Sequence, residues 1–263
     1  MLRGTFVFAV LLGTMSFAPT LASAQINFQK TGYYVAMGDS VAAGEGAVPV
    51  TGGYAYQLYD HGVFGRKQAM DFANVAVRGG RSWDLLDHQV PQVLCAEPAQ
   101  RPTVVTITAG ANDFLRNDPD ISGIAARVAE AINLLLNNDN VVVGSPVLDP
   151  VTLLPCRALA DVTILVSNYY SIPHPVPPVF EQLDAALMGF DQALRFWLQF
   201  VPVPAGSNVA IVDLYSASLG RQGLTLIERR LGFEGPFDFE IHPTNLGHSF
   251  IAKEFEMVWS SLH

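Results

Sequence analysis

Five short apolar segments, each suited to a buried β-strand, alternate in the sequence with longer segments that have a helical pattern. The expected strands are Tyr33–Met37, Phe72–Val77, Thr103–Thr108, Val162–Val166 and Val209–Val212. Strands that alternate with helices are connected by right-handed crossovers and pair in parallel, and the helices cover both faces of the sheet. The sequence therefore predicts an α/β fold with three layers and a five-stranded, mostly parallel sheet.

The segments between these strands have apolar residues at steps of three and four, as in a helix with one buried face. Helices are expected over Trp83–Leu94, Ile121–Leu135, Phe180–Trp197 and Leu246–Val258. In the last of these, the residues expected to face inward are Leu246, Phe250, Ile251, Phe255 and Val258. A turn-rich stretch at 137–159 and a proline-rich loop at 171–179 interrupt the alternation. No linker or internal repeat is evident, so we expect one domain.

The first 24 residues resemble a secretory signal peptide. Arg3 supplies a positive start, residues 6–17 are almost wholly apolar, and Ala22-Ser23-Ala24 forms a small-residue cleavage site. About twelve apolar residues are too few to span a bilayer, and no later run is longer and equally apolar. We therefore expect a protein exported to the periplasm or the medium, with no integral membrane segment and a mature domain over 25–263.

Charge and cysteine content narrow the classes of partner. The formal net charge is −9, so nucleic acid and anionic lipid surfaces would not attract the protein electrostatically. In an oxidising compartment, Cys95 and Cys156 are expected to form a disulfide, with two buried thiols as the alternative. Two cysteines without a histidine at ligand spacing do not make a zinc site. We expect no metal and no other cofactor.

Polar residues follow several of the expected strands at the point where each strand ends. Ser40 follows the first strand, Gly79 and Gly80 follow the second, and Asn112 follows the third. A long loop after the fifth strand holds His242. In open α/β sheets the ligand site lies outside the carboxyl ends of the strands, so we expect these groups to meet at one edge.

This combination of groups suits acyl transfer. A serine hydroxyl becomes a nucleophile when a neighbouring imidazole takes its proton. The developing oxyanion needs preorganised N–H donors, which the Ser40 and Gly79 amides and the Asn112 side chain can supply. We therefore expect Ser40 as the nucleophile and His242 as the base.

Four short blocks in these segments carry a resemblance to a known family. GDS at 38–40, NVAVRG at 74–79, GAND at 110–113 and HPTNLGH at 242–248 occur in the order found in the SGNH (GDSL) hydrolase superfamily. The resemblance implies a flavodoxin-like sheet, Ser40 as nucleophile, His242 as base, and an oxyanion hole of Ser40, Gly79 and Asn112. The runs VPQVL, RPTVVTITAGAND and NYYSIP are most similar to the secreted bacterial esterase and lipase branch.

The acid that would orient the imidazole departs from the family pattern. Asp-x-x-His would place this acid at position 239, which is Phe239 here. Asp238, Glu240 or a backbone carbonyl can take its place, and we favour the two carboxylates. Asp39 is expected to bond the backbone of its own turn. His248, six residues after His242, is expected to be a surface or packing residue.

The function expected from these residues is a secreted carboxylic ester hydrolase, an esterase or lipase. Its mechanism would be Ser–His, with Asp238 or Glu240 as the acid, and its substrates acyl esters of lipids or small alcohols. A carbohydrate esterase that removes acetyl groups is the alternative within enzymes. Because position 239 lacks the family acid, a non-catalytic secreted binding module is the alternative outside them.

Overall fold

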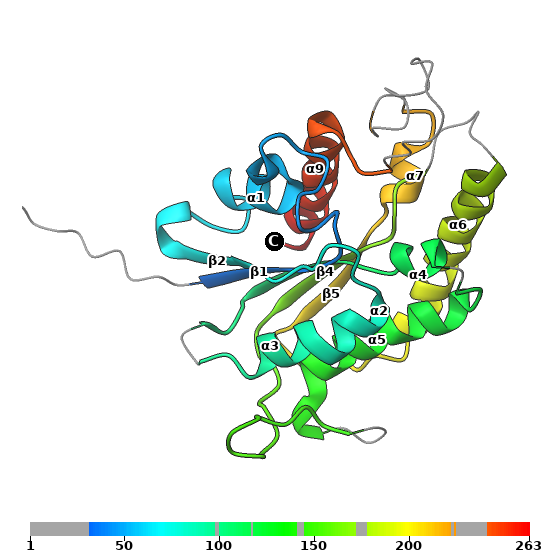
Figure 1. Ribbon diagram of the computed structural model, residues 1–263. Coiled ribbons are helices and arrows are strands. Elements are labelled where there is room, and N and C mark those ends of the chain that lie inside the picture. The colour runs from blue at the N-terminus through cyan, green and yellow to red at the C-terminus, as the bar shows by residue number, and fades with distance from the viewer. Residues whose placement is uncertain are drawn as a thin grey trace, which may run out of the picture.

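One parallel sheet of five strands forms the centre of the protein, in the order β2-β1-β3-β4-β5 (Figure 1). The strands are β1 (Gly32–Gly38), β2 (Met70–Asn74), β3 (Val104–Thr108), β4 (Thr163–Ser167) and β5 (Asn208–Val212). The computed structural model describes residues 32–97, 100–116, 118–140, 145–171, 178–221, 224 and 241–263. The expected signal peptide lies outside these residues. The predicted α/β fold and its strand order are those of a flavodoxin-like sheet.

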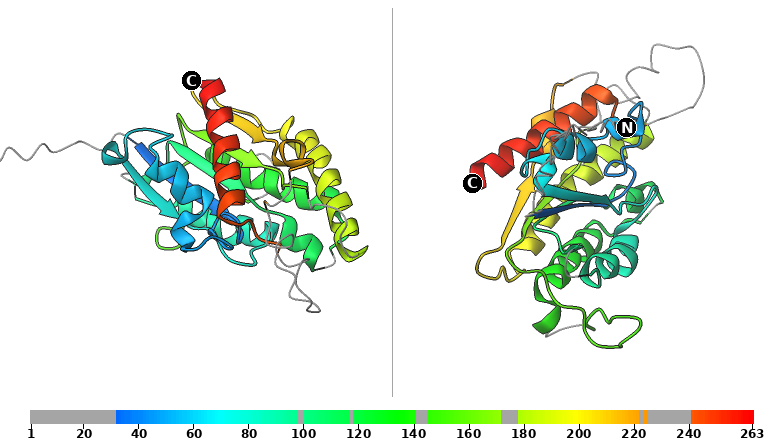
Figure 2. Two further views of the ribbon diagram at one scale, coloured as in Figure 1. Left: turned by 90° about the horizontal axis from the view of Figure 1, so that it is seen from above. Right: turned by 90° about the vertical axis from the view of Figure 1, so that its left-hand side faces the viewer.

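Helices cover both faces of the sheet (Figure 2). The α-helices are α1 (Tyr54–Asp60), α2 (Ser82–Asp84), α3 (Val90–Leu94), α4 (Ala111–Leu115), α5 (Ile121–Asn137), α6 (Pro178–Leu198), α7 (Leu214–Ser218) and α9 (Asn245–Leu262). A π-helical segment, η3 (Leu85–Gln89), joins α2 to α3, and short 3-10 turns are η1 (Val50–Gly52), η2 (Lys67–Ala69) and η5 (Asn138–Asn140). Helices α1 and α9 pack together on one face, whereas α2, η3, α3, α5 and α6 form the layer on the other.

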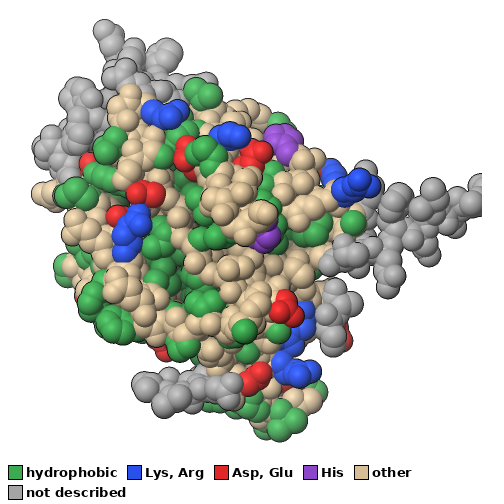
Figure 3. Space-filling view, turned by 180° about the vertical axis from the view of Figure 1, so that it is seen from behind, with side chains coloured by type: hydrophobic (Ala, Val, Ile, Leu, Met, Phe, Trp, Pro, Cys, Tyr) green, Lys and Arg blue, Asp and Glu red, His purple; other side chains and the backbone are tan. Residues whose placement is uncertain are grey.

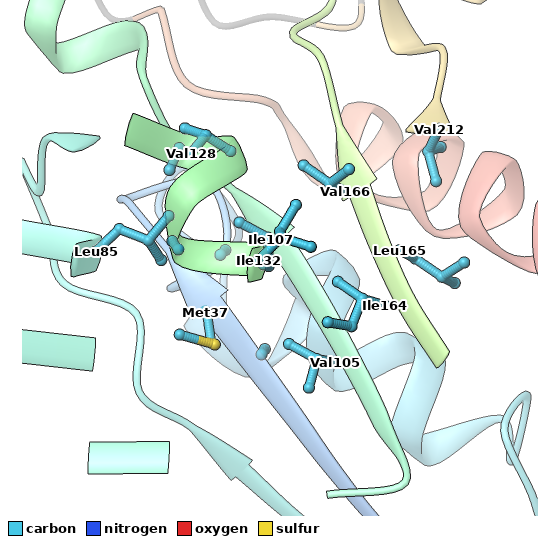
Figure 4. Close-up of a cluster of buried hydrophobic side chains, with 14 of the residues drawn as sticks. Met37, Leu85, Val105, Ile107, Val128, Ile132, Ile164, Leu165, Val166 and Val212 are labelled. Atoms are coloured by element: carbon cyan, nitrogen blue, oxygen red, sulfur yellow. The ribbon is translucent and has the colours of Figure 1, made fainter. Parts of the chain in front are cut away.

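The core lies between the central strands and the helices. Every residue of β3 and β4 is buried, as expected for strands covered on both faces. On the α5 side, Met37, Ile107 and Val166 belong to the same buried cluster as Val128 and Ile132 of α5 (Figure 4). The strands pair in parallel, so that their carboxyl ends form one edge.

The second strand ends earlier than predicted. We expected it to extend to Val77, but β2 ends at Asn74. The Asn74 side chain accepts the Ala76 N–H at 3.1 Å and donates to the Ala42 carbonyl at 2.8 Å. The Val75 and Val77 N–H groups still donate to carbonyls of β1, at 2.9 and 3.0 Å. The backbone therefore stays beside β1 past the end of β2, while the Ala76 N–H is bonded locally by the Asn74 side chain.

The buried face of the last helix also differs from the prediction. Leu246, expected to face inward, is 60% exposed, whereas Phe255 is fully buried. Nine residues are two and a half turns of an α-helix, so the two side chains point in opposite directions. His248, expected to be a surface or packing residue, is completely buried beneath the Ser40 turn.

A disulfide joins Cys95, at the end of α3, to Cys156, in the segment before β4. Asn138 supports the same segment, because its amide nitrogen donates to the carbonyls of Val147 and Cys156 at 3.0 and 2.6 Å. Part of the turn-rich stretch predicted at 137–159 is therefore fixed to the domain at two points.

Acidic and basic side chains are interspersed over the face opposite to that of Figure 1, and the described residues form no large basic patch there (Figure 3). Among the helices that the structure describes, none is both long enough and apolar enough to cross a membrane.

Candidate active site

The turn after β1 brings Ser40 to the carboxyl edge of the sheet. Gly38 has φ of 126°, and a Cβ there would lie 1.9 Å from the Thr108 carbonyl oxygen, so only glycine allows β1 to end this close to β3. The Asp39 N–H donates to the same oxygen at 2.9 Å. Ser40 follows directly and is 6% exposed.

The second expected segment lies beside this turn. The Val77 N–H donates to the Gly38 carbonyl at 3.0 Å, and the Gly80 N–H donates back to Val77 at 2.9 Å, which leaves Gly79 at φ of 68°. Within the part of the chain that the structure describes, the N–H groups of Gly79 and Ser40 have no acceptor. Because the Gly80 N–H is used in the turn, Gly79 is the better candidate for an oxyanion donor.

The third segment is tied to the second by buried side chains. The Asn112 amide nitrogen, on α4, donates to the Gly80 carbonyl at 3.0 Å, and an amide carries a second N–H. The buried Asp113 carboxylate accepts from the Ser82 N–H and hydroxyl, each at 2.8 Å, and from Arg127 at 3.3 Å. These bonds hold Asn112 against the Gly79–Gly80 turn.

The fourth segment delivers the histidine. His242 Nε2 lies 2.7 Å from Ser40 Oγ, although the two residues are 202 positions apart in the chain. The Tyr170 hydroxyl, after β4, donates to the Ile241 carbonyl at 2.7 Å and so fixes the backbone before the histidine. A Cβ at Gly46 would lie 2.9 Å from His242 Cβ, so the Ser40 turn packs closely against this segment.

The structure thus brings Ser40 and His242 into contact and places Asn112 against the Gly79 turn. Asp238 and Glu240, the acids expected to orient His242, lie outside the described residues.

Asp39 is buried in the turn rather than directed at the histidine. Its carboxylate accepts the Val41 N–H at 3.0 Å, as expected for a residue that holds its own turn, and the Tyr169 hydroxyl as well. Burial raises the pKa of Asp39 to about 7, against the opposing effect of the Tyr169 and Val41 hydrogen bonds.

Sequence reasoning missed two charged residues beside the histidine. Glu45 Oε2 lies 3.5 Å from His242 Nε2, and Arg78 Nε lies 3.7 Å from the same carboxylate oxygen. No motif marks Glu45, because its position depends on the way the turn closes: its neighbours Gly44 and Gly46 have φ of 88° and 91°. The glycines in GEG were the available signal.

The pKa of His242 depends on its burial and on the charges of Glu45 and Arg78. Burial lowers the pKa of the imidazole, the Glu45 charge opposes that effect, and the Arg78 charge adds to it. A lowered pKa keeps the imidazole neutral at neutral pH. His242 can then accept a proton from the hydroxyl beside it.

An apolar groove lies beside the Asn112 helix. It has a volume of about 420 Å³ and lies between α4, the start of α5 and α6. Its lining residues are Phe114, Leu115, Asp118, Pro119, Ile121, Gln182, Leu183 and Ala186. Leu115 follows Asn112 by three residues, and such residues lie on one face of a helix. Ser40, Gly79, Asn112 and His242 are themselves not among the residues that line the groove.

Comparison with known proteins places this site in a family. The sequence profile of the GDSL-like Lipase/Acylhydrolase family matches residues 36–250, which include all four blocks. No curated protein sequence matches the chain significantly.

Solved structures share the fold at low sequence identity. A GDSL-family lipolytic protein from Veillonella parvula has a TM-score of 0.55 and 16% identity, over 87% of this chain and 98% of its own. An acetyl esterase has a TM-score of 0.53 and 16% identity, over 88% of this chain and 97% of its own. A carbohydrate esterase of family 3 from Talaromyces cellulolyticus gives 0.52 and 16%, with coverage of 88% and 97%.

The matched region contains the end of β1, the other four strands, the Ser40 turn, the Asn112 helix and the histidine segment. The chain therefore belongs to the GDSL-like lipase/acylhydrolase family and is a carboxylic ester hydrolase.

Proposed function

We propose that the protein is an exported serine esterase that uses Ser40 as nucleophile and His242 as general base. The observation that carries the proposal is the 2.7 Å separation of Ser40 Oγ and His242 Nε2. At this distance the imidazole takes the hydroxyl proton as Oγ attacks the ester carbonyl carbon.

The remaining groups suit the charge that then develops. The N–H groups of Ser40 and Gly79 and the second N–H of Asn112 are the proposed donors to the oxyanion of the tetrahedral intermediate. When the intermediate collapses, the alcohol departs with the proton from His242 and leaves an acyl group on Ser40. Water, deprotonated by His242, releases the acid and restores both residues.

The groove favours acyl esters of lipids or small alcohols as substrates. A carbonyl held by the oxyanion donors would direct its acyl chain toward the apolar side chains beside Asn112, such as Leu115. The charge of Asp118 at the groove is compensated by Arg127, 3.0 Å away. An acetyl group would leave most of this apolar surface empty.

Removal of acetyl groups from carbohydrate is the second candidate. It is favoured by the likeness to an acetyl esterase and a carbohydrate esterase, which at 16% identity concerns the fold.

Ser40→Ala should abolish hydrolysis of p-nitrophenyl acetate, butyrate and palmitate alike. Equal rates for the wild-type protein and Ser40→Ala on all three esters would reject the Ser40 mechanism for these substrates.

The groove can be tested separately from the mechanism. Ala186→Phe should fill it and lower kcat/KM for the longer esters by at least tenfold, while hydrolysis of the acetate persists. Ala185→Phe is the matched control, because Ala185 is exposed and does not line the groove. An unchanged chain-length profile for Ala186→Phe would favour the acetyl esterase.

We also propose export, on the strength of the N-terminal pattern, with the Cys95–Cys156 disulfide as support. The mature chain would be one domain beginning at Gln25. N-terminal sequencing of the protein recovered from periplasm or medium tests this, and an uncleaved chain in the cytoplasm would contradict it.

A further inference from the structure

A carboxylate lies on the same side of the imidazole as the nucleophile. Glu45 Oε2 is 3.5 Å from His242 Nε2, the nitrogen that also contacts Ser40 Oγ. In Ser–His–Asp sites the orienting acid contacts the other ring nitrogen, Nδ1. Glu45 therefore does not take the place of the orienting acid at Nδ1, for which Asp238 and Glu240 are the expected residues.

The backbone of Glu45 is held at both ends. Its N–H donates to the Ser40 carbonyl at 2.9 Å, and its carbonyl accepts from His248 Nε2 at 2.9 Å. The flanking glycines allow the turn to bring the side chain back toward His242. The side chain is 28% exposed, so its charge is screened only in part by water.

The positive charge of Arg78 partly offsets the negative charge of Glu45. Its Nε lies 3.7 Å from Glu45 Oε2, and its side chain is 65% exposed. Among the described residues, the charges that act on His242 are those of Glu45, on the turn after β1, and Arg78, after β2. His248 of α9 also faces this turn but is held neutral by burial, and Asp39 is bonded to Tyr169.

We propose that Glu45 is a positioning residue for His242: its carboxylate stabilises the imidazolium formed when Ser40 loses its proton, and Arg78 limits the strength of that interaction. The proposal rests on the proposed Ser40–His242 mechanism. The proton passes from Ser40 Oγ to His242 Nε2 and then to the departing alcohol, while Glu45 remains charged throughout. The carboxylate thus favours the charged state of the base without exchanging a proton.

The test compares the charge-removing variants Glu45→Gln and Arg78→Gln. Glu45→Gln retains both backbone hydrogen bonds, so a structural role alone predicts no effect. Loss of the negative charge should lower the pKa of His242, moving the acid limb of kcat/KM down by about one pH unit. At the plateau pH, kcat should fall about tenfold with little change in KM. Loss of the positive charge in Arg78→Gln should move the acid limb to higher pH.

Two controls separate this proposal from the proposed function. Glu256→Gln removes an equivalent charge from the exposed face of α9 and should leave the pH profile unchanged. The pKa of His242 is also measured by NMR titration, with His242→Asn identifying its signal, and this measurement needs no turnover. If the wild-type protein hydrolysed the esters no faster than Ser40→Ala, the proposed function would be contradicted. The NMR titration of His242 would still show whether Glu45 acts on the imidazole. An unchanged His242 pKa in Glu45→Gln, or shifts of the same sign in both variants, would overturn the proposal.

Discussion

His242 and His248 are six residues apart and have opposite environments. His242 Nε2 contacts the Ser40 hydroxyl, and its side chain is 18% exposed. His248 is fully buried in the second turn of α9. Its Nδ1 accepts the Tyr54 N–H at 3.2 Å, and its Nε2 donates to the Glu45 carbonyl at 2.9 Å. Both ring nitrogens of His248 are thus used by backbone groups, which leaves no proton-transfer role for the ring.

Residues 242–248 thus hold one histidine placed for catalysis and one placed to support the structure. Pro243 follows His242 and disfavours helical backbone at the histidine, so His242 lies in the non-helical segment before α9. Thr244 then caps α9, which begins at Asn245 and carries His248 under the Ser40 turn. Glu45 connects the two histidines, because its carbonyl bonds His248 and its carboxylate faces His242. We therefore expect His242 to govern rate and His248 to govern stability.

The largest expected effect is the loss of activity in His242→Asn. Without the base, Ser40 keeps its proton, so kcat/KM for p-nitrophenyl butyrate should fall by at least 10³-fold, about 4 kcal/mol. The free energy of unfolding in urea should stay within about 1 kcal/mol of the wild-type value, since the imidazole is partly exposed and its hydrogen bond is to the Ser40 side chain. A loss below tenfold would remove His242 from the proposed mechanism.

His248→Ala should show the reverse pattern. It leaves the buried Tyr54 N–H and Glu45 carbonyl without partners, and each unsatisfied buried group costs about 1–3 kcal/mol. We expect the free energy of unfolding to fall by about 2–4 kcal/mol, and kcat/KM of the folded protein by less than tenfold. An activity loss as large as that of His242→Asn, in protein of unchanged stability, would contradict the division of roles.

The two histidines also differ in what made them predictable. Ser40, Gly79, Asn112 and His242 could be predicted together, because the carboxyl ends of parallel strands meet at one edge. The burial of His248 could not, since its bonds are to Tyr54 and Glu45, which are remote in sequence.

The same reasoning applies to the fold and to the charges. Apolar patterning predicted the five strands, whereas β2 ends at Asn74, whose side chain bonds the Ala76 N–H and the Ala42 carbonyl. Glu45 was missed because the turn after Ser40 decides where its side chain lies, and the glycines on either side of it were the one local signal.

The structural role of His248 should also make the stability of the protein depend on pH. Burial lowers the pKa of His248 to about 4, from about 6.5 in the unfolded chain. Between these values the unfolded chain binds a proton that the folded chain excludes. The stabilisation is therefore complete above pH 6.5 and is lost as the pH falls toward 4, by up to about 3 kcal/mol.

His248→Gln isolates this effect, because glutamine does not titrate. The difference in unfolding free energy between wild type and His248→Gln should shrink from pH 7 to pH 4, measured by urea denaturation. The raised pKa of Asp39 acts with the opposite sign, since its folded form gains a proton as the pH falls below 7. Asp39 is present in both proteins, so its contribution cancels. A difference independent of pH would mean that His248 does not titrate abnormally.

The smallest expected effect lies between the two histidines, at Thr244. Its hydroxyl accepts the Gly247 N–H at 3.2 Å and so caps the N-terminus of α9. Thr244→Ala should lower the free energy of unfolding by about 1 kcal/mol, whereas Thr244→Ser keeps the cap and should lose less. Because the cap supports the helix rather than the segment before it that holds His242, kcat/KM should change by less than tenfold. A 100-fold loss of kcat/KM in Thr244→Ala at nearly unchanged stability would be the contrary result. That result would mean that the cap positions His242, and that the start of α9 contributes to catalysis as well as to stability.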